Sequence, residues 1–86
     1  MQAREILAWN IRKIRVERGI SQERMALEAG VDRAYFGRIE RSKENISLGT
    51  VDALAKALNI TVAELFRMPL PDEEEPKSLK AGRKKL

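Results

Sequence analysis

The chain contains no cysteine and no histidine among its 86 residues. Without cysteine it can form neither a disulfide nor a thiolate nucleophile. Without histidine it lacks the commonest acid–base residue of enzymes and nearly every zinc-site pattern. The only acidic run, from Asp72 to Glu75, lies in a segment that we do not expect to fold. We therefore predict that the protein is not an enzyme and holds no metal ion or other cofactor.

Long apolar runs are absent as well. No stretch approaches the roughly 18 apolar residues that a membrane-spanning helix needs. Near the N-terminus, Arg4, Arg12, Lys13 and Arg15 interrupt the apolar residues, which is not the pattern of a signal peptide. We expect a protein without membrane contact that is located in the cytoplasm.

The charge balance is modestly basic, with 17 Lys and Arg residues against 13 Asp and Glu residues. Such an excess suits a nucleic-acid partner but also an ordinary solvated surface. From Pro69 onward the composition changes to prolines, an acidic run and a basic end that could contact phosphates or stay solvated. We predict one small folded domain over residues 1–70 and a flexible charged tail over residues 71–86.

The stretch from Ser21 to Glu40 predicts two short helices joined by a tight turn. Ser21 can cap the first helix by accepting hydrogen bonds from its free N–H groups, and Gly30 can end it in the left-handed conformation. Asp32 can then cap a second helix that begins at Arg33. The chain thus reverses direction within about three residues, which is typical of a helix-turn-helix motif.

Three further helices are predicted around this motif. Apolar residues at helical spacing indicate a helix over about residues 3–18, and another follows the N-cap Ser47 over residues 48–58. Thr61 and Glu64 form a capping box for a short last helix, which Pro69 cannot continue. The sequence therefore predicts an all-α fold of four to five short helices with a central helix-turn-helix.

Several short motifs carry a resemblance to a known family. Ser-Gln at 21–22, Met-Ala at 25–26, Ala-Gly at 29–30 and Ile-Glu at 39–40 resemble the Cro/repressor-type (Xre) transcriptional regulators. Asp32-Arg33-Ala34-Tyr35, Ile39-Glu40-Arg41 and Asn45 resemble, within that family, the small controller proteins of restriction-modification systems. The resemblance covers roughly residues 4 to 68. It implies a lambda-repressor-like DNA-binding domain.

If the second motif helix lies in the major groove, its outward face meets the bases. The resemblance places Arg33, Ala34 and Arg38 at base-reading positions, with Tyr35 beside them. Arg33 is the foremost candidate because an arginine can donate two hydrogen bonds to one guanine. Ala34 can contact a thymine methyl group, and the Tyr35 hydroxyl can reach a phosphate.

Phosphate contacts are expected from the two ends of the motif. Gln22 lies at a helix N-terminus, whose N–H groups can themselves face a phosphate, and Arg41 and Lys43 follow the second helix. The resemblance also implies an ion pair between Arg15 and Glu40 that orients the recognition helix.

Gly37 stands in the middle of the predicted recognition helix, where a glycine costs about 1 kcal/mol relative to alanine. Such a residue indicates that something approaches the helix closely. The sequence leaves open whether this is the DNA backbone or the first helix.

Ile60, Val62 and Phe66 offer more apolar surface than one short helix needs. In the controller-like relatives the fourth and fifth helices form the dimer contact, so the resemblance implies that these residues bind a second copy. The alternative is that they only complete the core and cover Trp9.

Together these patterns predict a homodimeric, sequence-specific DNA-binding transcriptional regulator, because one small motif contacts only a few base pairs. Its partners would be double-stranded DNA, at a near-palindromic operator, and a second copy of itself. Two alternatives use the same fold: an antitoxin that also binds a toxin protein, or an adaptor that binds only protein.

Overall fold

The structure is a computed structural model that describes residues 1–73, and this part of the chain contains five α-helices and no β-strand. The predicted all-α fold of four to five short helices is confirmed. The helices are α1 (Ala3–Glu17), α2 (Gln22–Ala29), α3 (Arg33–Glu40), α4 (Leu48–Leu58) and α5 (Val62–Leu65).

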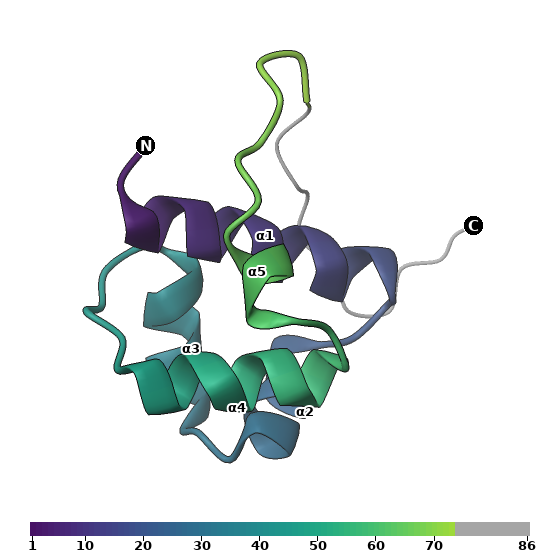
Figure 1. Ribbon diagram of the computed structural model, residues 1–86. Helices are drawn as coiled ribbons and strands as arrows, with labels where there is room; N and C mark the ends of the chain where they lie inside the picture. Colours follow the sequence, from purple (N-terminus) through teal and green to yellow (C-terminus); the bar gives the residue numbers. More distant parts are fainter. Residues whose placement is uncertain (74–86) are drawn as a thin grey trace.

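The helices pack around a single core. In Figure 1, α1 and α4 cross the molecule on opposite sides, and α5 lies between them and packs against both. Behind them, α3 packs against α1 and α2, and α2 packs against α4. The buried apolar side chains come from all five helices: Leu7, Ile11, Met25, Ala26, Phe36, Ile39, Val51, Leu54, Ala55, Leu58 and Leu65.

The predicted caps of the last two helices are confirmed. The Ser47 hydroxyl accepts a hydrogen bond from the Thr50 N–H at 3.1 Å. At α5, the Thr61 hydroxyl accepts from the Glu64 N–H at 3.2 Å, while the Glu64 carboxylate accepts from the Thr61 N–H at 2.8 Å. The Thr61 N–H, followed by the Thr61 hydroxyl, lowers the pKa of Glu64 because both donate to its charged form.

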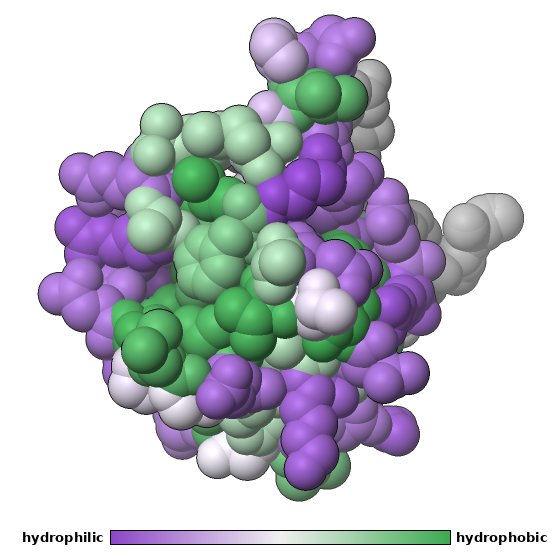
Figure 2. All heavy atoms as spheres, viewed as in Figure 1, coloured by the Kyte–Doolittle hydropathy of each residue, from purple (hydrophilic) through white to green (hydrophobic). Residues whose placement is uncertain are grey.

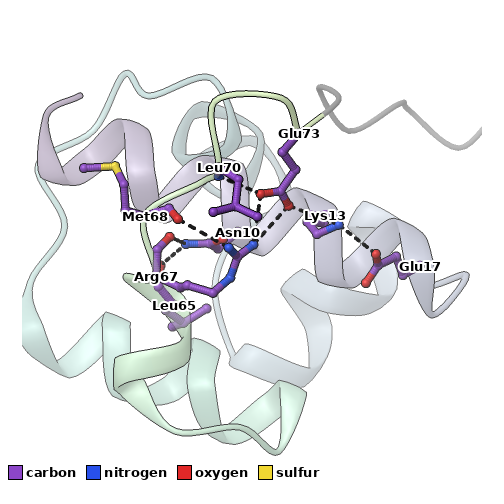
Figure 3. A network of polar contacts seen from close by, with 8 residues as sticks. All are labelled: Asn10, Lys13, Glu17, Leu65, Arg67, Met68, Leu70 and Glu73. Atoms are coloured by element: carbon purple, nitrogen blue, oxygen red, sulfur yellow. Dashed lines mark hydrogen bonds and ion pairs between the residues drawn. The ribbon is translucent and has the colours of Figure 1, made fainter.

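A buried polar side chain, Asn10, fastens α5 to α1. Only 2% of Asn10 is exposed, and its Nδ2 donates hydrogen bonds to the carbonyl oxygens of Leu65 at 2.9 Å and Arg67 at 2.8 Å (Figure 3). Leu65 is the last residue of α5 and Arg67 follows it, so neither carbonyl has a partner inside the helix. Asn10 therefore fixes where the chain leaves α5.

Trp9 lies away from this contact and is half-buried. It lines a hollow of about 230 Å³ together with Met1, Glu5, Arg12 and Ser42. Within the described part of the chain, no residue of α5 lines this hollow. The residues of α5 therefore do not close this hollow.

Residues 67–73, which we call the strap, form a loop that projects beyond α1 and turns back toward it, where Glu73 contacts Lys13 (Figure 1). The Glu73 carboxylate lies 3.0 Å from Arg67 Nη2 and 3.3 Å from Lys13 Nζ, and it accepts a hydrogen bond from the Leu70 N–H at 2.9 Å (Figure 3). These contacts extend three residues beyond the domain boundary predicted at residue 70. The rest of the predicted flexible tail, residues 74–86, lies outside the described residues.

The strap is expected to make stability depend on acid pH. The Leu70 N–H, then Arg67 and Lys13, lower the pKa of Glu73 from 4.5 to about 2. A carboxylate whose pKa is lower in the folded state stabilises the fold above the unfolded pKa, and this contribution is lost as pH falls from 4.5 toward about 2. Wild type should therefore melt at a higher temperature than Glu73→Gln at pH 7. Melting curves of both proteins between pH 7 and pH 2 should converge at the acid end, and a constant difference would contradict the assignment.

Candidate nucleic-acid interface

The corner between α2 and α3 forms through the predicted local signals. Ser21 Oγ accepts a hydrogen bond from the Arg24 N–H at 3.0 Å, and Gly30 ends α2 in the left-handed region with φ 72°. Asp32 Oδ2 accepts from the N–H groups of Ala34 at 2.9 Å and Tyr35 at 3.2 Å. These hydrogen bonds begin α2 and α3, and the left-handed Gly30 lets the chain turn between them.

The outer side of α3 carries the predicted base-contacting residues. Arg33, Ala34 and Arg38 are exposed and Tyr35 is half-buried, whereas Phe36 on the inner side is fully buried. The four residues therefore lie on the solvent side of one helix, with the two arginines five residues, or about 1.4 turns, apart.

The two arginines of this face differ in their partners. Arg38 Nε lies 2.5 Å from Glu44 Oε2, and its guanidinium lies 5.7 Å from the centre of the Tyr35 ring. The Glu44 carboxylate raises the pKa of Arg38, mainly through this hydrogen bond. Arg33, by contrast, forms no ion pair with any residue between Met1 and Glu73. Arg33 can therefore bind an external acceptor without giving up an internal one.

A buried ion pair lies beneath this surface and joins α1 to α3. Arg15 Nε lies 2.6 Å from Glu40 Oε2, and Arg15 Nη2 donates to Glu40 Oε1 at 3.0 Å, so the contact is bidentate. Both side chains are 3% exposed. Arg15 Nη1 also donates to the Ile20 carbonyl at 2.8 Å. The pair therefore connects α1, the turn before α2 and the end of α3.

The predicted phosphate contacts lie at two places. Arg41 and Lys43 are exposed where the chain leaves α3. Gln22 is half-buried and its Nε2 donates to Glu40 Oε1 at 2.8 Å, which extends the ion pair to α2. One N–H of this amide is thus used inside the protein, a role that the sequence did not reveal because Glu40 lies 18 positions away.

A second surface lies across α4 and α5, where Figure 2 shows apolar side chains gathered on one face. Leu48, Val62 and Phe66 are 81%, 39% and 37% exposed, and we call these three residues the α4–α5 face. Of the predicted interface residues, Ile60 instead packs partly against the core. A groove of about 390 Å³ lies beside the face and is lined by Leu48, Phe66 and the start of α1.

Between Met1 and Glu73, no group of three or more acidic side chains could hold a metal ion. None of the five helices is both long enough and apolar enough to cross a bilayer.

Residues 11–65 match the model of the helix-turn-helix family, and the chain belongs to this family. Over 75 residues it is 43% identical to control protein C.SmaI of Serratia marcescens, across 86% of this chain and 89% of that protein. The restriction-modification controller protein C.AhdI of Aeromonas hydrophila superposes with a TM-score of 0.71 and 40% identity, over 73% of this chain and 96% of that one.

A third relative is a hypothetical transcription factor from Neisseria, with a TM-score of 0.76 and 38% identity over 79% of this chain and 78% of that chain. The resemblance to Cro/repressor-type regulators, and to controller proteins among them, is thereby confirmed. The family consists of DNA-binding regulators and is not an enzyme family.

Proposed function

We propose that the protein is a transcriptional regulator that binds a near-palindromic DNA operator as a homodimer, with α3 in the major groove. The observation that carries this proposal is the outer side of α3, where Arg33 is exposed and unpaired within residues 1–73 while the turn and the Arg15–Glu40 pair hold the helix in place. A helix held in place with an unpaired guanidinium can donate to base edges without first breaking an internal ion pair.

In this proposal Arg33, Ala34, Tyr35 and Arg38 face the bases, while Gln22, Arg41 and Lys43 contact phosphates. To reach the DNA, the Arg38 side chain must either break its ion pair with Glu44 or approach together with that carboxylate. Arg38 therefore contributes less binding free energy than Arg33. The buried ion pair of Arg15 and Glu40 sets the orientation of α3. The protein has no catalytic role in this scheme and needs no cofactor.

The second copy is proposed to bind through the α4–α5 face together with Ile60. These side chains gather exposed apolar surface on α4, on α5 and just after it, and apolar side chains gathered on a protein surface are typical of a binding site. A two-fold dimer doubles the base contacts and presents two α3 helices to half-sites about one helical turn apart.

Selection of binding sites from random DNA, together with the mass of the free protein, tests the proposal. We expect an inverted repeat and a dimeric mass. A selection that returns no two-fold motif would contradict it. A stoichiometric complex with a different protein on the α4–α5 face would instead favour an antitoxin or an adaptor.

Two variants should distinguish contacts with bases from contacts with phosphates. Arg33→Ala is expected to relax base preference at one position of each half-site, which corresponds to about 1–3 kcal/mol of lost discrimination. Arg41→Ala should weaken binding to all sequences alike and reduce the slope of log affinity against log salt by about 0.9 per protomer. Titrations of both variants with the selected site and a scrambled site, at several salt concentrations, measure the two effects. Equal behaviour of the two variants would contradict the assignment.

A further inference from the structure

Gly37 has no contact that explains it within the packing of the helices. A methyl group built at this position would lie 3.0 Å from Arg33 Nη1 and 3.4 Å from Arg41 Nη1. Apart from the adjacent residues Phe36 and Arg38 and the nearby backbone of α3, no other atom of the described residues comes within 4 Å. The close approach that the sequence indicated is therefore made by two arginine side chains, and α1 takes no part in it.

The three residues form one row along α3, at positions 33, 37 and 41, because residues four apart lie above one another on a helix. Without a side chain at Gly37, both guanidinium groups can rest against the helix at this point. Gly37 is buried, and the side chains of Arg33 and Arg41 lie over its Cβ position.

The electrostatics of this arrangement favour an external anion. Neither Arg33 nor Arg41 forms an ion pair with a residue of the described part, so two cations lie side by side without a carboxylate. Arg38, which follows Gly37 in α3, forms an ion pair with Glu44. Like charges at close range repel each other, and a bound polyanion such as DNA relieves this repulsion.

We propose that Gly37 determines base preference through the position of Arg33. Because Gly37 has no side chain, the Arg33 guanidinium can lie against α3 beside Arg41, and from this position it meets the base edge. Gly37 is a positioning residue that acts through Arg33. This inference rests on the proposed function, since it assigns a role within the same DNA-binding surface.

The consequence of a methyl group here is specific. A separation of 3.0 Å is tighter than most contacts of a Cβ atom, so the Arg33 guanidinium must shift by a few tenths of an ångström, and its flexible end can do so without disturbing the core. A bidentate contact to guanine depends on the direction of both N–H groups, so even a small displacement weakens it. The backbone itself gains, because alanine favours the helix more than glycine does.

The test compares Gly37→Ala, Arg33→Ala and the double variant in thermal unfolding and in binding to the site selected by the wild-type protein. Gly37→Ala should melt at the same temperature as wild type or higher. Its affinity for the selected site should fall by about fivefold to tenfold, near the lower end of what a base-reading arginine contributes. In the Arg33→Ala background the same change should cause no further loss.

The other outcomes are equally informative. Unchanged affinity and base preference in Gly37→Ala would overturn the inference. So would an equal loss in the Arg33→Ala background, because the methyl group would then contact the DNA directly, and so would a clear fall in melting temperature, which would indicate a packing role. If the wild-type protein selects no sequence at all, the proposed function itself fails, a result that is visible before any variant is made.

Discussion

Glu40→Ala is expected to lower the free energy of unfolding by about 3–5 kcal/mol, the range for removal of one partner from a buried ion pair. The carboxylate accepts two hydrogen bonds from Arg15 and one from Gln22, and the Arg15 side chain is only 3% exposed. Its removal leaves a buried guanidinium without a counter-charge. Urea unfolding monitored by circular dichroism measures the loss.

Two companion variants define what this result means. Glu28→Ala removes a carboxylate from an exposed pair with Arg24 and should change stability by no more than about 1 kcal/mol. Replacing both partners with apolar residues, as Arg15→Met with Glu40→Leu, should recover most of the stability, because no buried charge remains. If this double variant folds but still binds its operator poorly, the pair orients α3. Wild-type stability of Glu40→Ala would contradict the contact.

Replacement of Val62 and Phe66 by serine is expected to convert the proposed dimer to a monomer and to weaken operator binding by on the order of a hundredfold or more, because the second half-site then no longer binds as part of the same complex. Both side chains are exposed and apolar, and neither belongs to the core. The serines remove apolar contact area without adding charge, so they leave the attraction between protein and DNA unchanged. Sedimentation equilibrium and operator titration measure the two effects.

The matched control replaces Met68 and Leu70 by serine. These residues are also exposed and apolar, at 56% and 61%, but they lie on the strap. The control should keep the mass and the operator affinity of the wild type. If it also dissociates the protein, the dimer forms through the strap, and if neither variant does, the α4–α5 face is not the interface.

Features that depend on neighbouring residues could be predicted from the sequence. The caps at Ser21, Asp32 and Ser47 and the left-handed glycine at Gly30 each act within about three positions, so residue type and spacing were enough. The same holds for which residues of α3 face outward, because helical periodicity separates Phe36 from its exposed neighbours.

Contacts between distant parts of the chain could not be predicted in this way. Asn10 stands in α1 with nothing nearby to show that two carbonyl groups at the end of α5 need a donor. Gln22 has the right position for a phosphate contact, yet the sequence cannot show that Glu40 comes within 2.8 Å of it. The pairing of Arg38 with Glu44 across the loop after α3 depends in the same way on how that loop folds.

The position of Asn10 and Arg15 on one helix has a consequence for the length of the operator. Asn10 binds the end of α5, and Arg15 binds the end of α3. Because both residues stand on α1, these two attachment points lie about 7–8 Å apart along the axis of a single helix. In the proposed dimer built on the α4–α5 face, each protomer then holds its own α3 at a fixed distance and angle from the interface. Such a dimer cannot change the spacing of its two α3 helices to match a longer operator. An extra base pair between the half-sites adds about 3.4 Å and turns one half-site by about 34°. Only one α3 then stays in register with its half-site.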